Sequence, residues 1–169
     1  MNELSKAWNQ IEWLHNAGIS LIPVRDKTEG DYPAKTPYRG WKQYQSEQIP
    51  LPDLWSQMEQ HKTEAVAIIA GKVSGNLEII DIDVKYKPGI DATLFSDLKQ
   101  LYPELLAKLR INKTPSGGYH ILYRIESGEV PGNVKLAGRP ATPAELEARP
   151  KTKQYNFLET RGEGGYAVA

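Results

Sequence analysis

The chain has 169 residues, 40% of them hydrophobic and 25% charged, a balance typical of a globular domain and unlike that of a disordered or membrane-embedded chain. Lysine plus arginine and aspartate plus glutamate both number 21, so the formal net charge is zero, which excludes nucleic-acid binding through an overall positive field. Cysteine is absent and no apolar run is long enough for a signal peptide or a bilayer span, so we expect one cytoplasmic domain without disulfides or thiolate metal sites.

The first predicted elements are an amphipathic helix over 4–16, a strand over 19–24 and a second helix over 51–60. Apolar residues recur at helical spacing in both helices, and Gly18 stands where the first helix would end. Proline cannot donate to a strand ladder, so Pro23 places the strand at the edge of a sheet or ends it. The chain therefore begins with an αβ unit.

The polar segment 25–40 is predicted to be a loop and carries a candidate phosphate contact. Lys35 stands shortly before a proline, a glycine and Trp41, a run that anchors a cation beside an aromatic ring. A solvated surface loop is the alternative reading.

Two apolar runs, 65–70 and 77–84, are predicted to be strands, and the short glycine-containing turn between them suggests a hairpin. Asp81 and Asp83 interrupt the second run at a spacing of two, so both should project from one face. Adjacent carboxylates repel unless a cation neutralises them, and Mg²⁺ is commonly held by one or two carboxylates plus substrate phosphates. The pair is a candidate divalent-metal site, with a solvated strand end as the alternative.

Strands are also predicted over 110–114 and 119–124, joined by a glycine turn. Ser116 and Gly117 lie in this turn, and His120 emerges beside it. The glycines allow a ligand to approach the backbone closely, and a hydroxyl, backbone amides and an imidazole together suit a triphosphate. A purely structural histidine is the alternative.

The remaining patterns complete the predicted fold. A leucine repeat over 91–109 predicts helix covering one face of the sheet. Residues 126–153 predict an irregular excursion, and residues 155–169 a terminal hairpin whose inward acid is Glu159. The excursion's basic residues are candidate contacts to a nucleic-acid backbone, with a solvated loop as the alternative: Arg139, Arg149, Lys151 and Lys153.

Three of these motifs, in this order, resemble the active-site motifs of the archaeo-eukaryotic primase superfamily. They are Asp81-x-Asp83, the run from Ser116 to His120, and the run from Glu159 through Arg161 to Tyr166. The nearest resemblance is to the bifunctional DNA primase/polymerase (prim-pol) N-terminal domain of plasmid, phage and other mobile-element replication proteins. Each motif alone is weak, but three in order over most of the chain argue against chance.

The resemblance implies an α+β fold, in which an RRM-like mixed β-sheet carries the acids and packs with helices and the N-terminal αβ unit. It implies that catalytic Mg²⁺ or Mn²⁺ ions are bound by Asp81, Asp83 and Glu159. It also implies contacts to the phosphates of an incoming dNTP or NTP from Ser116, Gly117 and His120, with Arg161 and Lys35 as lesser candidates. Glu159 departs from the family, in which the third acid is usually aspartate.

The function implied is template-directed nucleotidyl transfer by a two-metal mechanism, as a DNA primase or DNA polymerase in the replication of a mobile element. Single-stranded or primed DNA would be the template, and no membrane is involved. We expect residues 1–169 to form one catalytic domain of a longer protein that also carries a helicase or other C-terminal domain. The alternatives are a catalytically inactive nucleic-acid-binding module of the same fold and a nucleotide-sugar glycosyltransferase, whose Asp-x-Asp motif also binds metal and diphosphate.

Overall fold

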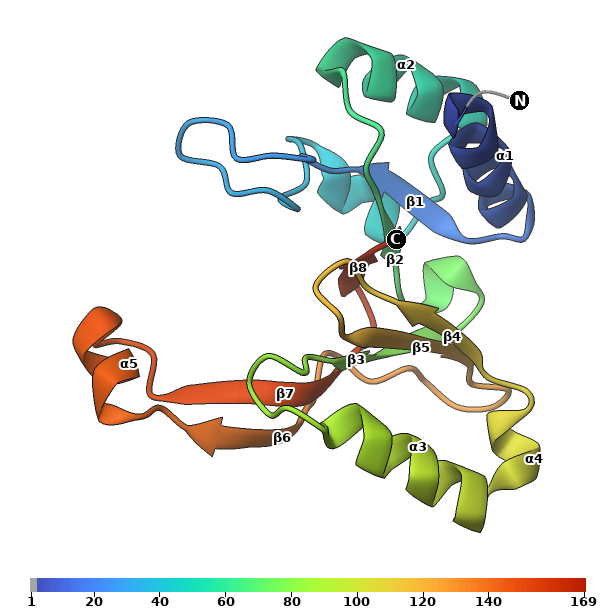
Figure 1. Ribbon diagram of the computed structural model, residues 1–169. Helices are drawn as coiled ribbons and strands as arrows, with labels where there is room; N and C mark the ends of the chain where they lie inside the picture. The colour runs from blue at the N-terminus through green and yellow to red at the C-terminus, as the bar shows by residue number, and fades with distance from the viewer. Residues whose placement is uncertain (1–2) are drawn as a thin grey trace. The chain divides into compact units, whose positions relative to one another are not determined.

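The computed structural model describes residues 3–169, which divide into two compact units (Figure 1). The first unit comprises the chain up to Leu77, Arg124–Gly132 and Gly162–Ala169. The second comprises Glu78–Tyr123 and Asn133–Arg161. None of the helices found between residues 3 and 169 is long and apolar enough to cross a membrane.

The first unit is built on a three-stranded antiparallel sheet with strand order β1-β2-β8. Its elements are α1 (Glu3–Asn16), β1 (Ser20–Pro23), the 3-10 turns η1 (Trp41–Gln45) and η2 (Lys72–Ser74), α2 (Leu51–His61), β2 (Val66–Ile69) and β8 (Tyr166–Val168). The two predicted helices and the edge position of the first strand are confirmed.

The core of the first unit follows from the apolar periodicity of these elements. Leu21 and Ile22 of β1, Ile69 of β2 and Leu54 of α2 are completely buried. Burial of a side chain of this size contributes about 1.5–3 kcal/mol. Met58, one helical turn after Leu54, is also buried, so α2 presents its predicted apolar face to the interior.

The second unit is a five-stranded sheet with strand order β4-β5-β3-β7-β6. Its elements are β3 (Leu77–Ile82), α3 (Ile90–Leu101), α4 (Pro103–Leu106), β4 (Arg110–Lys113), β5 (Tyr119–Arg124), β6 (Lys135–Pro140), α5 (Pro143–Ala148) and β7 (Gln154–Arg161). The path β3–α3–β4 with β5 inserted between its strands is a split βαβ unit, as in RRM-like folds. The α+β class is confirmed, and the sheet, predicted to be mixed, is antiparallel.

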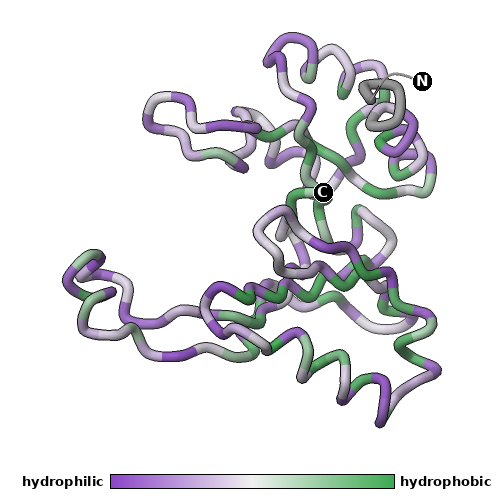
Figure 2. The backbone as a smooth tube through the Cα atoms, viewed as in Figure 1, coloured by the Kyte–Doolittle hydropathy of each residue, from purple (hydrophilic) through white to green (hydrophobic). Residues whose placement is uncertain are grey.

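One face of the five-stranded sheet is covered by α3, as the leucine repeat predicted. The ring of Phe95 on α3 packs edge-on against Tyr119 of β5 at 5.0 Å, and Ile82 and Ile121 are buried. Figure 2 shows hydrophobic residues concentrated along the strands, whereas the extension formed by β6, α5 and β7 is mostly hydrophilic. Residues that alternate with this apolar set, among them Asp81 and His120, project from the other face.

Both predicted hairpins are wrong, because the chain changes sheet at each turn. β2 belongs to the three-stranded sheet and β3 to the five-stranded one, joined only by the bridge Gly71↔Leu77; β7 and β8 are separated in the same way. Ser74 in the intervening turn is buried, and its hydroxyl donates to the carbonyl of Ile69 (2.6 Å) and accepts from the N–H of Ser20 (2.9 Å). These bonds hold the turn against β1 and β2, so β3 does not fold back to pair with β2.

The predicted irregular excursion contains more regular structure than its composition indicated. Thr142 caps α5 through a reciprocal capping box with Glu145, whose carboxylate also accepts two hydrogen bonds from Arg139 at 2.7 and 2.8 Å. Arg139 additionally lies over the ring of Tyr155 and donates to the carbonyl of Tyr86 (2.8 Å). This arginine is therefore engaged within the protein, unlike the freely solvated cation expected in a loop.

Candidate active site

The face of the five-stranded sheet away from α3 carries a row of polar side chains, one from each strand. In order across β4, β5, β3, β7 and β6 they are Asn112, His120, Asp81, Glu159 and Lys135. The strand register pairs Asn112 with His120, Asp81 with Glu159, and Glu159 with Lys135. The imidazole Nε2 of His120 lies 3.7 Å from Oδ1 of Asp81. Directly opposed residues of antiparallel strands share a face, so this row is one continuous polar surface.

Asp81 and Glu159 form the acidic centre of the row. Like charges directly opposite each other on neighbouring strands are destabilising, and here a cation lies between them. The Arg161 guanidinium Nη2 donates to Oδ2 of Asp81 (3.1 Å) and to Oε1 of Glu159 (2.5 Å). The side chains of Asp81, Glu159 and Arg161 are 23%, 24% and 28% exposed, so the cluster is accessible to ions and ligands.

Asp83 lies just past the end of β3, two residues after Asp81. Its Oδ2 forms an ion pair with Nζ of Lys85 at 2.8 Å, and its N–H donates to the carbonyl of Phe157 (3.0 Å). The hydrogen bond to Asp83 raises the pKa of Lys85. Within residues 8–169, whose side chains the structure describes, no group of three or more histidine, aspartate or glutamate side chains has an arrangement that would hold a metal ion.

The donor set nevertheless suits a hard divalent cation in its chemistry. Carboxylate oxygens are the ligands that Mg²⁺ and Mn²⁺ prefer in proteins. Asp81 and Glu159 face each other on one sheet surface, and both already share one positive charge, that of Arg161. The two carboxylates are therefore suitable ligands for a hard cation, and in this structure Arg161 supplies the neutralising charge.

The turn between β4 and β5 places the predicted phosphate-binding residues. Gly117 has a left-handed φ of 89°, and a β-carbon on Gly118 would collide with the carbonyl oxygen of Ile82. Glycine at 118 therefore lets the start of β5 lie directly against the end of β3, which positions His120 beside the acids. Ser116 is exposed, with its hydroxyl 3.1 Å from that of Thr114.

Lys35 belongs to the first unit, in the loop that follows β1. Its backbone has a left-handed φ of 70°, and its N–H donates to the carbonyl of Arg25 (2.7 Å). Trp41 packs edge-on against Tyr166 at 5.3 Å in the same unit. The phosphate contact of Lys35 remains a prediction.

Lys135 and Asn112 are members of the row that the sequence did not indicate. Both flank the predicted residues only through strand pairing, since Lys135 is opposite Glu159 and Asn112 is opposite His120. Asn112 is recognisable in retrospect because it lies in a predicted strand next to Ile111, whose side chain points to the opposite face. Lys135 carried no local signal, because its register depends on irregularities between β6 and β7.

The structure thus defines a class of α+β protein whose RRM-like sheet carries opposed carboxylates, flanked by a histidine and further cations, all of them groups that suit ions and phosphates. Comparison with known families narrows this class. Residues 11–169 match the model of the bifunctional DNA primase/polymerase N-terminal domain, and the chain belongs to this Prim-Pol family, as its motifs indicated. No curated protein matches the chain. Membership implies nucleotidyltransferase activity in DNA synthesis, and enzymes of the family typically depend on divalent metal ions.

Proposed function

We propose that this chain is a template-directed primase and polymerase that transfers a nucleotidyl group from a dNTP or NTP to a 3′-hydroxyl paired with a DNA template. The observation that carries the proposal is the pairing of Asp81 with Glu159 on neighbouring strands, with His120 beside them, on a chain of the Prim-Pol family. Residues far apart in the sequence thus lie together on one sheet face.

In this proposal Asp81, Asp83 and Glu159 hold Mg²⁺ or Mn²⁺. When bound, the ions supply charge stabilisation of the attacking and leaving oxygens. Ser116 and the backbone at Gly117 contact the nucleotide phosphates, and His120 donates to them from the strand that follows. Lys35 is a further candidate contact. The side chain of Glu159 is one methylene longer than the family's usual aspartate, and its reach to Arg161 at 2.5 Å supports a role for it in the same cluster.

Arg161 has two roles in the proposal. In the structure described here it neutralises Asp81 and Glu159. The planar fork of its guanidinium is also well suited to a nucleotide phosphate, which it would contact from beside the two carboxylates. Hydrogen-bond donors directed at the charge that develops in the transition state contribute strongly to catalysis, since removal of one typically lowers the rate roughly 10²–10³-fold.

A second candidate function is a nucleic-acid-binding module of the same fold without catalysis. The observation that favours it is that Asp81, Asp83 and Glu159 are all engaged by basic side chains, Arg161 and Lys85. The glycosyltransferase alternative has no support from the family match. The cellular context we propose is replication of a mobile element together with a helicase or other domain of the full-length protein.

Primer extension and de novo priming with Mg²⁺ or Mn²⁺, using dNTPs and NTPs separately, test this proposal. We expect metal-dependent, template-directed incorporation that Asp81→Asn reduces at least 10³-fold, on the order of the loss of one key charge-stabilising group. Asp97→Asn, at an exposed position of α3, is the matched control and should retain full activity. Template binding without incorporation under every metal condition would instead favour the inactive module.

A further inference from the structure

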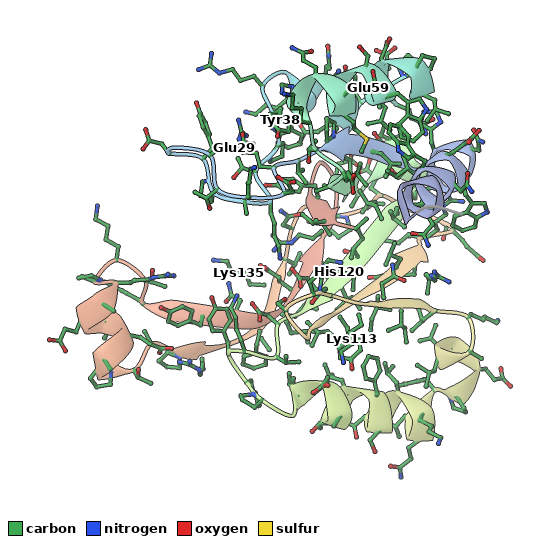
Figure 3. All side chains as sticks on the ribbon, turned by 45° about the horizontal axis from the view of Figure 1, so that its top comes forward. Glu29, Tyr38, Glu59, Lys113, His120 and Lys135 are labelled. Atoms are coloured by element: carbon green, nitrogen blue, oxygen red, sulfur yellow. The ribbon has the colours of Figure 1, made fainter. Side chains whose placement is uncertain are left out.

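Lys135 ends the polar row on β6, the edge strand of the five-stranded sheet. The residue is exposed, and it takes part in none of the ion pairs described between residues 3 and 169. Figure 3 shows Lys135 and His120 on the same side of the sheet, whereas Lys113 lies on the side of α3. A free cation therefore stands at the β6 end of the acidic pair.

The backbone around Lys135 is fixed, although its side chain is solvated. The N–H of Thr160 donates to the carbonyl of Val134 (2.7 Å), and the N–H of Val134 donates to Oγ1 of Thr160 (3.2 Å). Immediately after Lys135 the β6–β7 register shifts. Such irregularities bend an edge strand and re-aim its side chains, and they are common beside active sites.

The order of the strands determines on which side of the acidic pair Lys135 lies. The proposed phosphate donors Ser116 and His120 lie on the β4–β5 side of Asp81, whereas Lys135 lies beyond Glu159 on the other side. In nucleotidyl transfer the attacking and leaving oxygens are roughly in line. If the pyrophosphate leaves toward β5, the primer strand that brings the attacking 3′-hydroxyl approaches from β6.

We propose that Lys135 is a positioning residue for the primer strand, whose backbone phosphate its ammonium group binds near the 3′-terminus. This inference rests on the proposed function. It assigns the β4–β5 side of the same site to the nucleotide and the β6 side to the primer. Lysine acts on phosphate as a point charge, which suits a phosphodiester contact without base recognition. Neutralisation of Glu159 is the competing role, but the guanidinium of Arg161 already lies 2.5 Å from that carboxylate.

The test compares Lys135→Ala with His120→Ala, and uses Lys113→Ala as the matched control. Lys113 is an exposed lysine of the same sheet but of its other face. Fluorescence anisotropy measures the Kd for a primer–template duplex in the absence of nucleotide, and steady-state kinetics measure KM for primer–template and for dNTP separately. Thermal melting monitors folding.

We expect Lys135→Ala to raise Kd and KM for primer–template about 5–10-fold, to reduce the salt slope of binding by about 1, and to leave KM for dNTP unchanged. Lys135→Arg should restore affinity, and Lys113→Ala should have no effect. His120→Ala should show the converse pattern, a raised KM for dNTP at unchanged DNA affinity.

Two outcomes would overturn the inference. A raised KM for dNTP alone would make Lys135 a nucleotide ligand, and a lowered melting temperature or altered Mn²⁺ affinity at unchanged DNA affinity would make it a partner of Glu159. Failure of the proposed function can be told apart from failure of this inference, because the anisotropy measurement detects DNA binding by Lys135 even in a protein that shows no catalysis. If the protein is active but its affinity for primer–template is the same with and without Lys135, only the present inference is rejected.

Discussion

At the scale of single residues, Asp81 and Glu159 keep two negative charges side by side because Arg161 donates to both carboxylates. From the sequence alone, adjacent carboxylates repel each other, so their removal is expected to leave the stability of the free protein unchanged or to raise it. The ion pairs to Arg161 and Lys85 remove the basis for that expectation. Because all these side chains are partly exposed, each pair is worth no more than about 1 kcal/mol.

We therefore predict that Asp81→Asn/Asp83→Asn abolishes nucleotide addition and, because two such ion pairs are lost, changes the free energy of unfolding by less than about 2 kcal/mol. Primer extension and denaturant unfolding on the same preparation check both parts. Retained polymerisation by the double variant would remove these residues from the site, and a loss of about 3 kcal/mol or more would mark them as structural.

A second residue-scale prediction concerns Glu145 at the start of α5. Two hydrogen bonds from Arg139, together with the N–H of Thr142, lower the pKa of this carboxyl from 4.5 to about 2. A carboxylate whose pKa is depressed by folding contributes stability above its unfolded pKa. That contribution is lost as the pH falls from 4.5 through about 2.

Titration of the Glu145 carboxyl by NMR should give a midpoint near 2, with loosening of α5 over the same pH range. In Arg139→Ala the midpoint should rise toward 4.5, because the largest cause of the depression is removed. A wild-type midpoint near 4.5 would show that the ion pair is not maintained in solution.

At the scale of elements, the approach of β5 to β3 determines where His120 lies. Gly118 has no room for a β-carbon, because the carbonyl oxygen of Ile82 occupies that position. A side chain there would push the start of β5 away from β3. The separation between His120 and Asp81, on these same strands, would change with it.

Gly118→Ala is thus expected to lower the free energy of unfolding by about 2 kcal/mol and to reduce nucleotide use. Gly132→Ala is the matched control, since a β-carbon at Gly132 meets nothing within 4 Å and its φ is not left-handed. Equal stability of the two variants would contradict the close packing of β5 on β3.

At the scale of the whole molecule, a formal net charge of zero leaves DNA binding to local groups of cations. Four exposed basic residues of the segment around β6 and α5 take part in no described ion pair within residues 3–169: Lys135, Arg149, Lys151 and Lys153. Arg139 is excluded from this group by its bond to Glu145.

If these four cations are the main phosphate contacts, the plot of log Kobs against log salt concentration should have a slope no steeper than about −4. Anisotropy titrations between low and moderate salt measure it. Replacement of Arg149, Lys151 and Lys153 by alanine should flatten the slope by about 2–3. A wild-type slope near −8 would show that other surfaces contribute.

The local elements and the motifs could be predicted from the amino-acid sequence. Helical periodicity predicted α1, α2 and α3, and alternation in the strand around Asp81 predicted which of its residues share a face. The order of the acidic, histidine and third-acid motifs indicated the Prim-Pol family, which the family match confirms. These properties depend on side chains close together in the chain, so they are readable without tertiary structure.

Which strands pair, and therefore which charged side chains lie opposite each other, depends on the tertiary structure. The two hairpins predicted from short turns do not form, because β2 and β8 belong to one sheet and β3 and β7 to the other. The opposition of Asp81 to Glu159, the bridging by Arg161 and the place of Lys135 all follow from that pairing. Strand register is set by burial of whole sheet faces and by irregular pairing along β6, which are properties of segments distant in sequence.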